Sequence, residues 1–292
     1  MARKSANRGQ SRVASPVPLA FGWRFSEHDQ FQEVAVGWNL ETLPMDKGGF
    51  TADISYWTTS ARDFEISRTR YSAPLRQFGQ PPAGLRTLVL PMAESMDMLW
   101  RGTRIGGNDL LVFPTGGELD AFTKPGFDVV TISVSEELFD ESLDSMVDPG
   151  QVKRLLKNEV LSCAPEAVRS LRKNVTHILA SNRGSSHPVP GILPVDEIVL
   201  PFMSTIEQSA FSGQARPWPR RHMAARRVAE YIDAHAHQAP RIGQLLKVGA
   251  IGERALEYGF RDLFGVTPKT YLQVCRLNLV WNELRGAEPG EV

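Results

Sequence analysis

The sequence predicts an α+β protein, in which a region of short β-strands is followed by a helical region that ends in a helical hairpin. Three observations support this class. Residues 21–134 contain short segments rich in β-branched and aromatic residues, separated by Gly, Pro, Asn and Asp at intervals of about ten residues. After Ser135 the apolar residues recur at helical spacing. Residues 244–284 then have the pattern of two short helices joined by a Gly-containing turn.

The β region has the strand lengths and turn spacing of an all-β sandwich or barrel. Tight turns are expected at residues 114–117 and 124–126, where Pro and Gly occur together. The segment 102–107 is also expected to be a turn, with no helix after it to hold a phosphate. The predicted strands lie within residues 51–60, 63–72, 85–92, 97–102, 109–117, 118–123 and 127–135.

Four segments after the β region have helical spacing, and a last helical block extends from His222 to Leu284. The first segment begins after Ser135, whose side chain suits an N-cap. The third has one apolar stripe, formed by Val168, Leu171, Val175, Ile178 and Leu179. The four segments are residues 136–147, 150–161, 165–182 and 194–211.

These patterns divide the chain into several parts, with residues 181–191 expected to be a loop. The expected parts are a disordered basic tail (1–19), a β domain (20–135), a helical segment (136–212), a linker (213–221), a helical module (222–286) and an acidic tail (287–292).

The net charge of zero is the sum of two unlike parts. Residues 1–215 carry 21 Lys and Arg against 25 Asp and Glu, whereas residues 216–292 carry 12 against 8. An acidic part joined to a basic module is the asymmetry expected of a sensor joined to a nucleic-acid reader, although chance also produces an excess of this size. The neutral total argues against a wholly basic nucleic-acid wrapper or a polybasic membrane protein.

Composition excludes several other classes. With 292 residues, 42% of them hydrophobic, the chain can form a core without a metal or disulfide staple. Cys163 and Cys275 are far apart in sequence, which argues against a disulfide scaffold and a structural zinc site. Because no segment resembles a secretory signal or a transmembrane helix, we expect a cytoplasmic protein without a membrane partner.

No set of residues has the spacing of a catalytic or metal site. Only His28 precedes residue 177, and His235 and His237 would lie about 200° apart around a helix, which is unsuitable for one shared metal. The sequence contains no GxSxG, P-loop or GxGxxG element. We therefore expect neither an enzyme nor a protein with a metal or other cofactor.

The β region could still bind a small effector in an apolar pocket, although neither the effector nor the residues that bind it can be identified from sequence. Aromatic residues that could line such a pocket, or simply belong to the core, are Trp57, Trp100, Phe113, Phe122 and Phe127. Arginines that could meet an anionic effector are Arg68, Arg70, Arg76, Arg86 and Arg101.

The last helical block contains the pattern of a helix-turn-helix. A short helix with Leu245 and Leu246 precedes a turn at residues 248–251, and a second helix begins near Gly252 and continues through Phe264. The face of the second helix that is expected to be buried contains Leu256, Phe260, Leu263 and Phe264.

The stretch FGVTPKTYLQVCRLNLV, which follows, closely resembles the AraC-type transcription regulators. The residues that match are Phe264, Gly265, Pro268, Tyr271, Leu272, Arg276 and Leu277. Gly265 suits the left-handed position that ends a helix, and Thr267 can cap the next helix with Pro268 at its first position. The upstream stretch LLKVGAIGERALEYGF resembles the first helix-turn-helix of the branch related to ethanolamine-operon regulators.

The resemblance implies a regulator with a sensor domain, often a cupin-like β-barrel with a helical dimerisation segment. We therefore expect a cupin-like β-barrel or sandwich, a helical dimerisation segment and a C-terminal all-α helix-turn-helix module. The partners implied are double-stranded DNA, a second copy of the chain, a small-molecule effector and RNA polymerase.

Three features depart from the family pattern. The family has two helix-turn-helix units, and the second is absent from this sequence, which reaches Val292 soon after the expected linker helix. Gly252 replaces the usual Ser cap, at a cost of only a few tenths of a kcal/mol. The stretch 240–244 is one residue shorter than usual, and Trp281 replaces a common Arg. A single module buries only about 600–1,000 Å² on DNA, so we expect the helices within residues 165–211 to pair two chains.

The resemblance places the DNA contacts on and around the second helix of the hairpin. The expected base contacts come from Arg254 and Tyr258, flanked by Glu253 and Glu257, and Arg254 could donate two hydrogen bonds to a guanine edge. The expected phosphate contacts come from Lys247, Arg261, Lys269 and Arg276. The alternative is that these are solvated or paired charges, and Glu257 and Arg261 have the spacing to pair with each other.

Two functions are compatible with the sequence. The first is a transcription regulator that binds specific DNA through one helix-turn-helix per chain, under the control of dimerisation and an effector in the β domain. The alternative is a truncated sensor and dimerisation protein that no longer binds DNA specifically and acts through mixed dimers.

Overall fold

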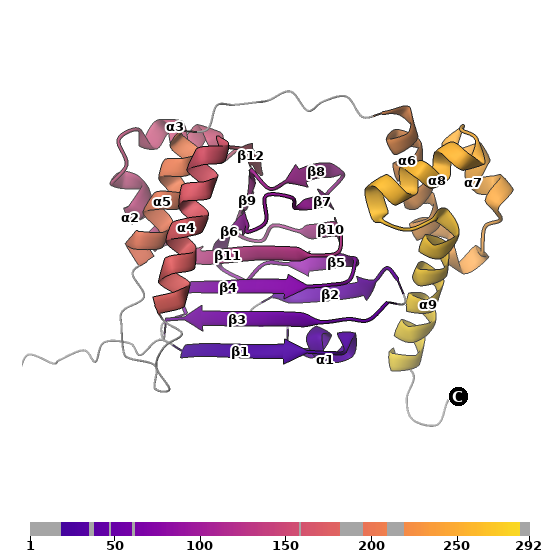
Figure 1. Cartoon of the computed structure of the whole chain (residues 1–292), viewed down its shortest axis with the longest axis horizontal. Helices are drawn as coiled ribbons and strands as arrows, with labels where there is room; N and C mark the ends of the chain where they lie inside the picture. The colour runs from indigo at the N-terminus through magenta and orange to yellow at the C-terminus, as the bar shows by residue number, and fades with distance from the viewer. Residues whose placement is uncertain are drawn as a thin grey trace, which may run out of the picture.

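The computed structural model describes residues 19–34, 38–46, 48–59, 62–157, 159–181, 195–208 and 219–286. In this part of the chain the strands form a central sandwich, and two groups of helices lie at its opposite ends (Figure 1). One group contains α2 (Glu136–Asp144), α3 (Pro149–Leu155), α4 (Pro165–Ser181) and α5 (Val195–Glu207). The other contains α6 (Arg220–His235), α7 (Ile242–Gly249), α8 (Glu253–Phe264) and α9 (Pro268–Gly286). The predicted α+β class is confirmed.

The sandwich consists of two antiparallel sheets. The larger sheet has the order β1-β3-β4-β11-β6-β9-β12, and the smaller has the order β2-β5-β10-β7-β8. Strands of the larger sheet are β1 (Leu19–Phe25), β3 (Ala52–Thr58), β4 (Phe64–Tyr71), β6 (Leu85–Pro91), β9 (Asp109–Phe113), β11 (Phe127–Ser135) and β12 (Val160–Ser162). Strands of the smaller sheet are β2 (Asn39–Pro44), β5 (Leu75–Gln80), β7 (Asp97–Trp100), β8 (Thr103–Gly106) and β10 (Leu119–Thr123).

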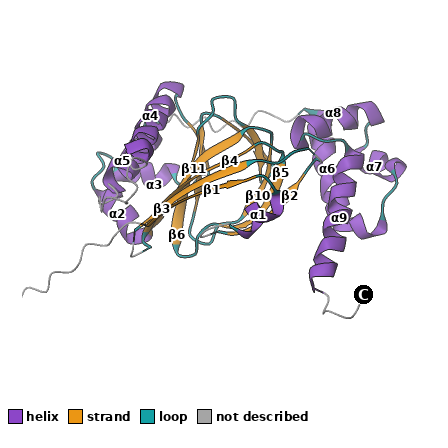
Figure 2. Ribbon diagram, turned by 60° about the horizontal axis from the view of Figure 1, so that its bottom comes forward, coloured by secondary structure: helices purple, strands orange, loops and turns teal. Residues whose placement is uncertain are grey.

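Successive residues of each strand point to opposite faces of its sheet, and this alternation produces three cores. In β11, Val130 and Ile132 belong to a core that is shared with α2–α5, whereas Val129 faces the smaller sheet. In β7, Met98 belongs to the core between the sheets, whereas Leu99 belongs to a third core shared with α6–α9. Each sheet therefore separates two apolar layers. Figure 2 shows the strands and the two groups of helices from a second direction.

The strands richest in β-branched and aromatic residues agree with the prediction, but several elements were missed. Segment 102–107 is not a simple turn, because Arg101 and Gly102 adopt left-handed conformations and Thr103–Gly106 pairs with β7 as β8. The other missed elements are β1, β2, β5 and a short helix, α1 (His28–Glu33). The predicted turn at residues 114–117 is confirmed by a hydrogen bond of 2.9 Å from the Gly117 amide to the Pro114 carbonyl.

The helix predicted over residues 150–161 is only half correct. Helix α3 ends at Leu155, and residues 160–162 form β12 at the edge of the larger sheet. The backbone of these residues pairs with the open edge of β9, which provides hydrogen-bond partners that a helix would not use. The side chain of Leu161 is buried in the core on the helical side of the larger sheet. Ser135 caps α2 as predicted, by accepting a hydrogen bond from the Leu138 amide at 3.3 Å.

Several predicted segments lie outside the described residues. They are most of the tail at 1–19, residues 182–191 of the predicted loop, residues 213–218 of the linker and the acidic tail at 287–292. Helix α6 begins at Arg220, directly after Pro219 at its N-cap position. Among the described helices, none is both long and apolar enough to cross a membrane.

Candidate nucleic-acid interface and effector cavity

Helices α7 and α8 form a helix-turn-helix. After α7 ends at Gly249, Ala250 adopts a left-handed conformation with a φ of 49°. Its amide donates a hydrogen bond of 3.2 Å to the carbonyl oxygen of Lys247. Gly252 is extended and starts α8, and its position carries no side-chain cap. The chain therefore changes direction between the two helices, as the sequence pattern predicts.

Helix α6 supports both arms of the helix-turn-helix from behind. A Cβ atom on Gly259 of α8 would lie 2.5 Å from the carbonyl oxygen of Arg221, so this approach requires glycine. The side chain of Arg227 donates a hydrogen bond of 2.8 Å to the carbonyl oxygen of Gly249 at the end of α7. Both contacts were missed from sequence, although a glycine inside a helical pattern often indicates close packing.

The face of α8 that was predicted to be buried is buried. Leu256 and Phe260 are fully enclosed, and Leu263 and Phe264 are 4% and 3% exposed. Gly265 ends the helix in a left-handed conformation with a φ of 73°. The next helix is capped by Thr267, whose hydroxyl accepts a hydrogen bond of 3.1 Å from the Thr270 amide. These local predictions are confirmed.

The opposite face of α8 carries the four residues that were expected to contact bases. Glu253 and Arg254 are exposed, Tyr258 is 51% exposed, and Glu257 is half-buried. Glu257 and Arg261 do not form the ion pair that their spacing allows. The structure thus brings the four residues onto one accessible side of one helix.

The cations expected to contact phosphates lie on all three helices around the turn. Lys247 is on α7, Arg261 on α8, and Lys269 and Arg276 are on α9, and all four are exposed. Within the described residues, neither these four cations nor Arg254 forms an ion pair with a carboxylate. Other basic residues of the module are neutralised, since Arg221 pairs with Asp262 at 2.9 Å and Arg226 with Glu230 at 3.3 Å. The predicted set is thus free of ion pairs, and so are Arg220, Arg227 and Arg241 among the described residues of the module.

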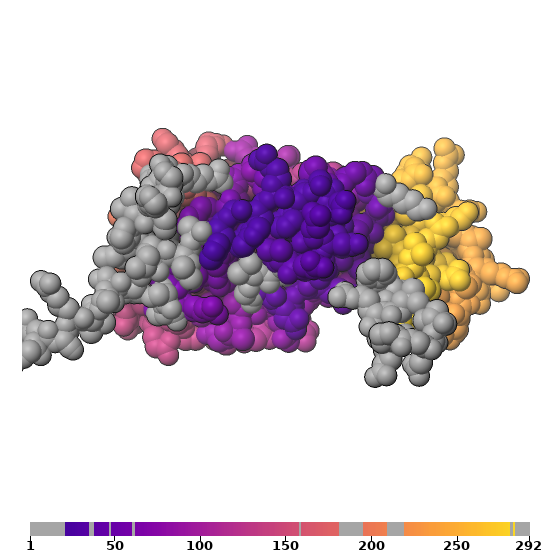
Figure 3. All heavy atoms as spheres, turned by 90° about the horizontal axis from the view of Figure 1, so that it is seen from below, coloured from indigo at the N-terminus to yellow at the C-terminus, as the bar shows by residue number. Residues whose placement is uncertain are grey.

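The helical module packs directly on the smaller sheet. Figure 3 shows the yellow C-terminal part of the chain against the indigo N-terminal part. Phe122 of β10 contacts Phe264 and Tyr271, with ring centroids 4.7 and 5.8 Å apart. Arg76 of β5 donates hydrogen bonds of 2.7 Å to Asp233 and 2.8 Å to the Tyr271 hydroxyl. Arg76 and Phe122, which were candidates for an effector pocket, therefore lie at this domain contact.

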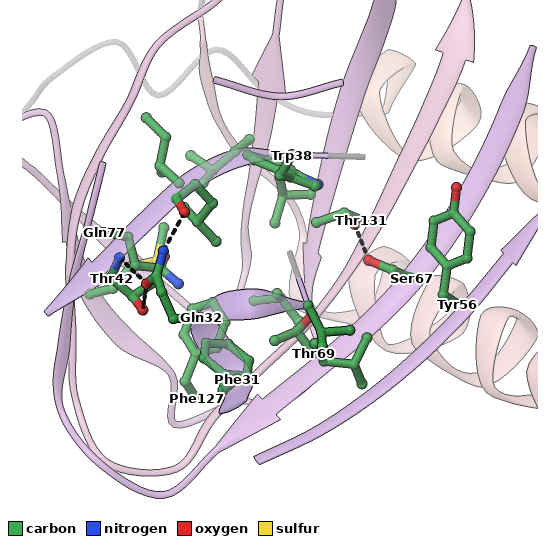
Figure 4. A pocket seen from close by; sticks show the side chains of 18 of the residues that line it. Phe31, Gln32, Trp38, Thr42, Tyr56, Ser67, Thr69, Gln77, Phe127 and Thr131 are labelled. Atoms are coloured by element: carbon green, nitrogen blue, oxygen red, sulfur yellow. Dashed lines mark hydrogen bonds between the residues drawn. The ribbon is translucent and has the colours of Figure 1, made fainter. Parts of the chain in front are cut away.

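A cavity lies between the two sheets of the sandwich, with a volume of about 90 Å³ (Figure 4). Phe113 and Phe127 line it as the sequence suggested, and Phe31 and Trp38 add further aromatic walls. Trp57 instead packs on the helical side of the larger sheet, and Trp100 lies behind Phe113. The lining contains both apolar side chains and a few hydroxyl and amide groups.

The arginines that could have met an anionic effector do not line this cavity. Each is paired with a carboxylate: Arg68 with Asp128 at 2.7 Å, Arg70 with Asp53 at 3.6 Å, Arg76 with Asp233 at 2.7 Å, Arg86 with Glu136 at 3.0 Å and Arg101 with Glu159 at 2.9 Å. None of the described lining residues is charged. The sequence missed this because alternation along a strand decides which side chains face inward.

The polar groups near the cavity form short networks. The side-chain oxygen of Gln32 accepts hydrogen bonds from the backbone amide of Thr42 at 2.7 Å and from the Thr42 hydroxyl at 2.5 Å. His28 contacts the same hydroxyl at 2.8 Å, and burial lowers the pKa of His28. Ser67 and Thr131 are hydrogen-bonded to each other at 2.7 Å. No group of three or more potential metal ligands occurs among residues that the structure describes.

Comparisons with known proteins give similarities but no match to a protein-family model. The chain is 24% identical over 121 residues to a probable thc operon regulatory protein of Rhodococcus erythropolis. The matched stretch covers 41% of this chain and 36% of that relative, so the similarity spans about a third of the relative's length.

Three solved structures give weaker likenesses. The AraC-like transcriptional activator CuxR is 15% identical, with 91% of this chain and 96% of that chain covered and a TM-score of 0.46. ToxT from Vibrio cholerae O395 is 9% identical, with 93% and 85% covered and a TM-score of 0.31. A cupin 2 conserved barrel domain protein from Salinispora arenicola is 15% identical, with 35% and 82% covered and a TM-score of 0.21.

Residues 264–277 carry the motif that resembles AraC-type regulators, and a stretch of 121 residues is similar to an operon regulatory protein. The β domain is an antiparallel sandwich, and a cupin barrel protein is among the solved structures to which the chain is similar. The branch related to ethanolamine-operon regulators has only weak support.

Proposed function

We propose that this chain binds specific double-stranded DNA through α7 and α8, with one helix-turn-helix per chain. The observation that carries the proposal is the accessible side of α8, where Arg254 and Tyr258 are exposed on a helix whose other side is packed. The ion-pair-free cations around it would meet phosphates, which position the helix on the duplex. No catalytic residue is part of this proposal.

The test is DNA binding of the full chain to a selected site and to a scrambled site, at two or more salt concentrations. Arg254→Ala is expected to weaken binding to the selected site by about 1–3 kcal/mol and to relax its specificity. Arg261→Ala should weaken binding to both sites alike and lower the salt dependence by about one charge. Arg154→Ala, on α3, serves as the control because that exposed side chain lies in the other helical group and outside α4 and α5.

If binding depends on salt but not on the DNA sequence, the chain is instead a sensor and dimerisation protein without specific DNA binding. One observation favours this second function. Gly252 provides no side-chain cap for the recognition helix, whereas a Ser there would add a hydrogen bond. Equal affinity of the parent protein for the selected and the scrambled site would support this second function.

We also propose that two copies of the chain pair through α4 and α5. A groove between these helices is lined by small residues, including Ala167, Ser170 and Ser204, which allow the close approach of another helix. Pairing would give the avidity that one module lacks. Sedimentation at micromolar concentration is expected to show a dimer, which Ser170→Arg should weaken, and a monomeric parent protein would contradict the proposal.

The last part of the proposed function is a regulatory ligand in the cavity between the sheets. The cavity is enclosed by the domain that packs against the DNA-binding module, so its occupancy can influence that module. RNA polymerase remains a partner that the family resemblance implies.

A further inference from the structure

One buried polar side chain in the cavity has no partner. Gln77 points inward from β5, beside Thr42 of β2 and Ala121 of β10, and only 7% of it is exposed (Figure 4). Its amide makes no hydrogen bond to any of the described residues, and the residue lines the cavity. Buried amides in folded proteins are almost always paired, because an unpaired one loses its hydrogen bonds to water without replacement.

Most other polar side chains around the cavity already have partners, whereas the Thr69 hydroxyl and the Trp38 indole N–H have no side-chain hydrogen bond among the described residues. Gln32 is bound to Thr42 and to the carbonyl oxygen of Leu40, the latter at 2.7 Å. Ser67 is bound to Thr131. Of the two amide side chains among the described lining residues, Gln32 is bonded and Gln77 is not. Gln77 therefore offers two donors and an acceptor, and a molecule in the cavity would complete its hydrogen bonds.

The walls determine the charge of such a molecule. Every described lining residue is neutral, and the five arginines of this region are paired with carboxylates on outward faces. An ionised carboxylate or phosphate would therefore lose its hydration without meeting a cation. His28 does not supply one, since it is held by Thr42 and burial lowers its pKa.

The size and the remaining walls determine its shape. A volume of about 90 Å³ corresponds to roughly six water-sized groups. The walls opposite Gln77 come largely from aromatic and branched side chains, including Phe113, Phe127 and Leu111. Such walls favour a compact apolar body.

We propose that the cavity binds a small, neutral, mainly apolar molecule whose single amide, hydroxyl or carbonyl group is hydrogen-bonded by Gln77. This inference rests on the regulatory ligand of the proposed function and adds the chemical class of that ligand. A neutral ligand differs from the anionic effector that the arginines of the β region suggested.

The experiment compares two probes of equal size, isobutyramide and isobutyrate, for binding to the full chain by calorimetry. Isobutyramide is expected to bind at least tenfold more tightly than isobutyrate, because only the neutral probe enters without losing an ionic hydration shell. Gln77→Leu is expected to weaken isobutyramide binding about tenfold. The matched control is Gln80→Leu, an exposed glutamine on the same strand, which should leave binding unchanged.

Three results would overturn the proposal: no isobutyramide binding up to its solubility limit, isobutyrate binding as tight as isobutyramide binding, or unchanged isobutyramide binding by folded Gln77→Leu. Folding of that variant is checked by its urea midpoint, which should not fall, since the change removes an unpaired amide. DNA binding is measured separately on the same samples. Loss of DNA binding would refute the proposed function alone, whereas a failure of the probes would refute only the ligand class.

Discussion

Glu65 is an acidic side chain on the inner side of the larger sheet, where it is 8% exposed. The Tyr56 hydroxyl donates a hydrogen bond of 2.7 Å to one of its carboxylate oxygens. Burial raises the pKa of Glu65, and the hydrogen bonds from Tyr56 and Ser133 only partly offset this effect. Burial also raises the pKa of Tyr56, to about 12. The ionised form of Glu65 is therefore less stable in the folded protein than in the unfolded chain.

This shift has a definite sign for stability against pH. Because the folded pKa is raised, the folded state holds its proton more strongly, and stability falls as pH rises from the unfolded pKa of about 4.3 through the folded pKa. Glu65→Gln removes that dependence and keeps an acceptor for Tyr56. We expect the variant to gain stability relative to the parent between pH 4 and pH 8, as measured by urea unfolding. Glu41→Gln, an exposed change on β2, should leave the pH profile unaltered, and a profile of Glu65→Gln parallel to that of the parent would contradict the interpretation.

At the scale of elements, the predictable parts are those whose local composition agrees with their final structure. β11, with the sequence FDVVTISVS, alternates between two cores, and α8 has its apolar residues on one side. β5 was missed because LRQFGQ contains no β-branched residue, although it is paired on both sides in the sheet. β12 was missed because its partner, β9, is distant in sequence. In both cases backbone pairing overrides weak local preference.

The contact between α6 and α8 makes a prediction for one glycine. Gly259→Ala would place a methyl group 2.5 Å from the Arg221 carbonyl oxygen, so the two helices must separate. We expect a loss of roughly 1–3 kcal/mol of stability, as for other overpacked sites. The measurement is the urea midpoint of the full chain.

Gly243→Ala on α7 is the matched control for this change. Nothing lies within 4 Å of its added Cβ, and alanine favours the helix by roughly 0.5–1 kcal/mol over glycine. Its midpoint should therefore stay or rise. Equal midpoints for the two variants would show that α6 and α8 do not need glycine at their contact.

At the scale of the whole molecule, the smaller sheet is shared by the cavity and the helix-turn-helix module. Neighbouring residues of β5 face opposite ways, since Gln77 lines the cavity and Arg76 holds the module. β7 repeats the arrangement with Met98 inside and Leu99 outside. A change on the inner side can therefore alter the outer side through one rigid layer. No local pattern could predict this, because Arg76 meets partners 157 and 195 residues away.

Cys275 of α9 reports whether the module is docked on the sheet. Its sulfur lies 3.5 Å from Asp233, and burial, followed by the charge of Asp233, raises the pKa of the thiol to about 12. Arg76 acts in the opposite direction, since its positive charge lowers this pKa. A thiol that reaches solvent has a pKa near 8.5, so its thiolate, which is the reactive form, becomes far more abundant at pH 8.

We therefore expect Arg76→Gln to raise the alkylation rate of Cys275 at pH 8 by at least about tenfold, as measured by mass spectrometry of the modified peptide. The direction of the change in alkylation rate shows whether the module stays docked on the sheet or is released. If the module stayed docked, the loss of Arg76 would raise the thiol pKa further and slow the reaction, whereas release of α9 from the sheet speeds it. Arg68→Gln breaks a comparable ion pair with Asp128 on the larger sheet and should leave the rate unchanged. A rate in Arg76→Gln that is equal to or below the parent's would mean that the apolar contact of Phe122 with Phe264 and Tyr271 holds the module without the arginine.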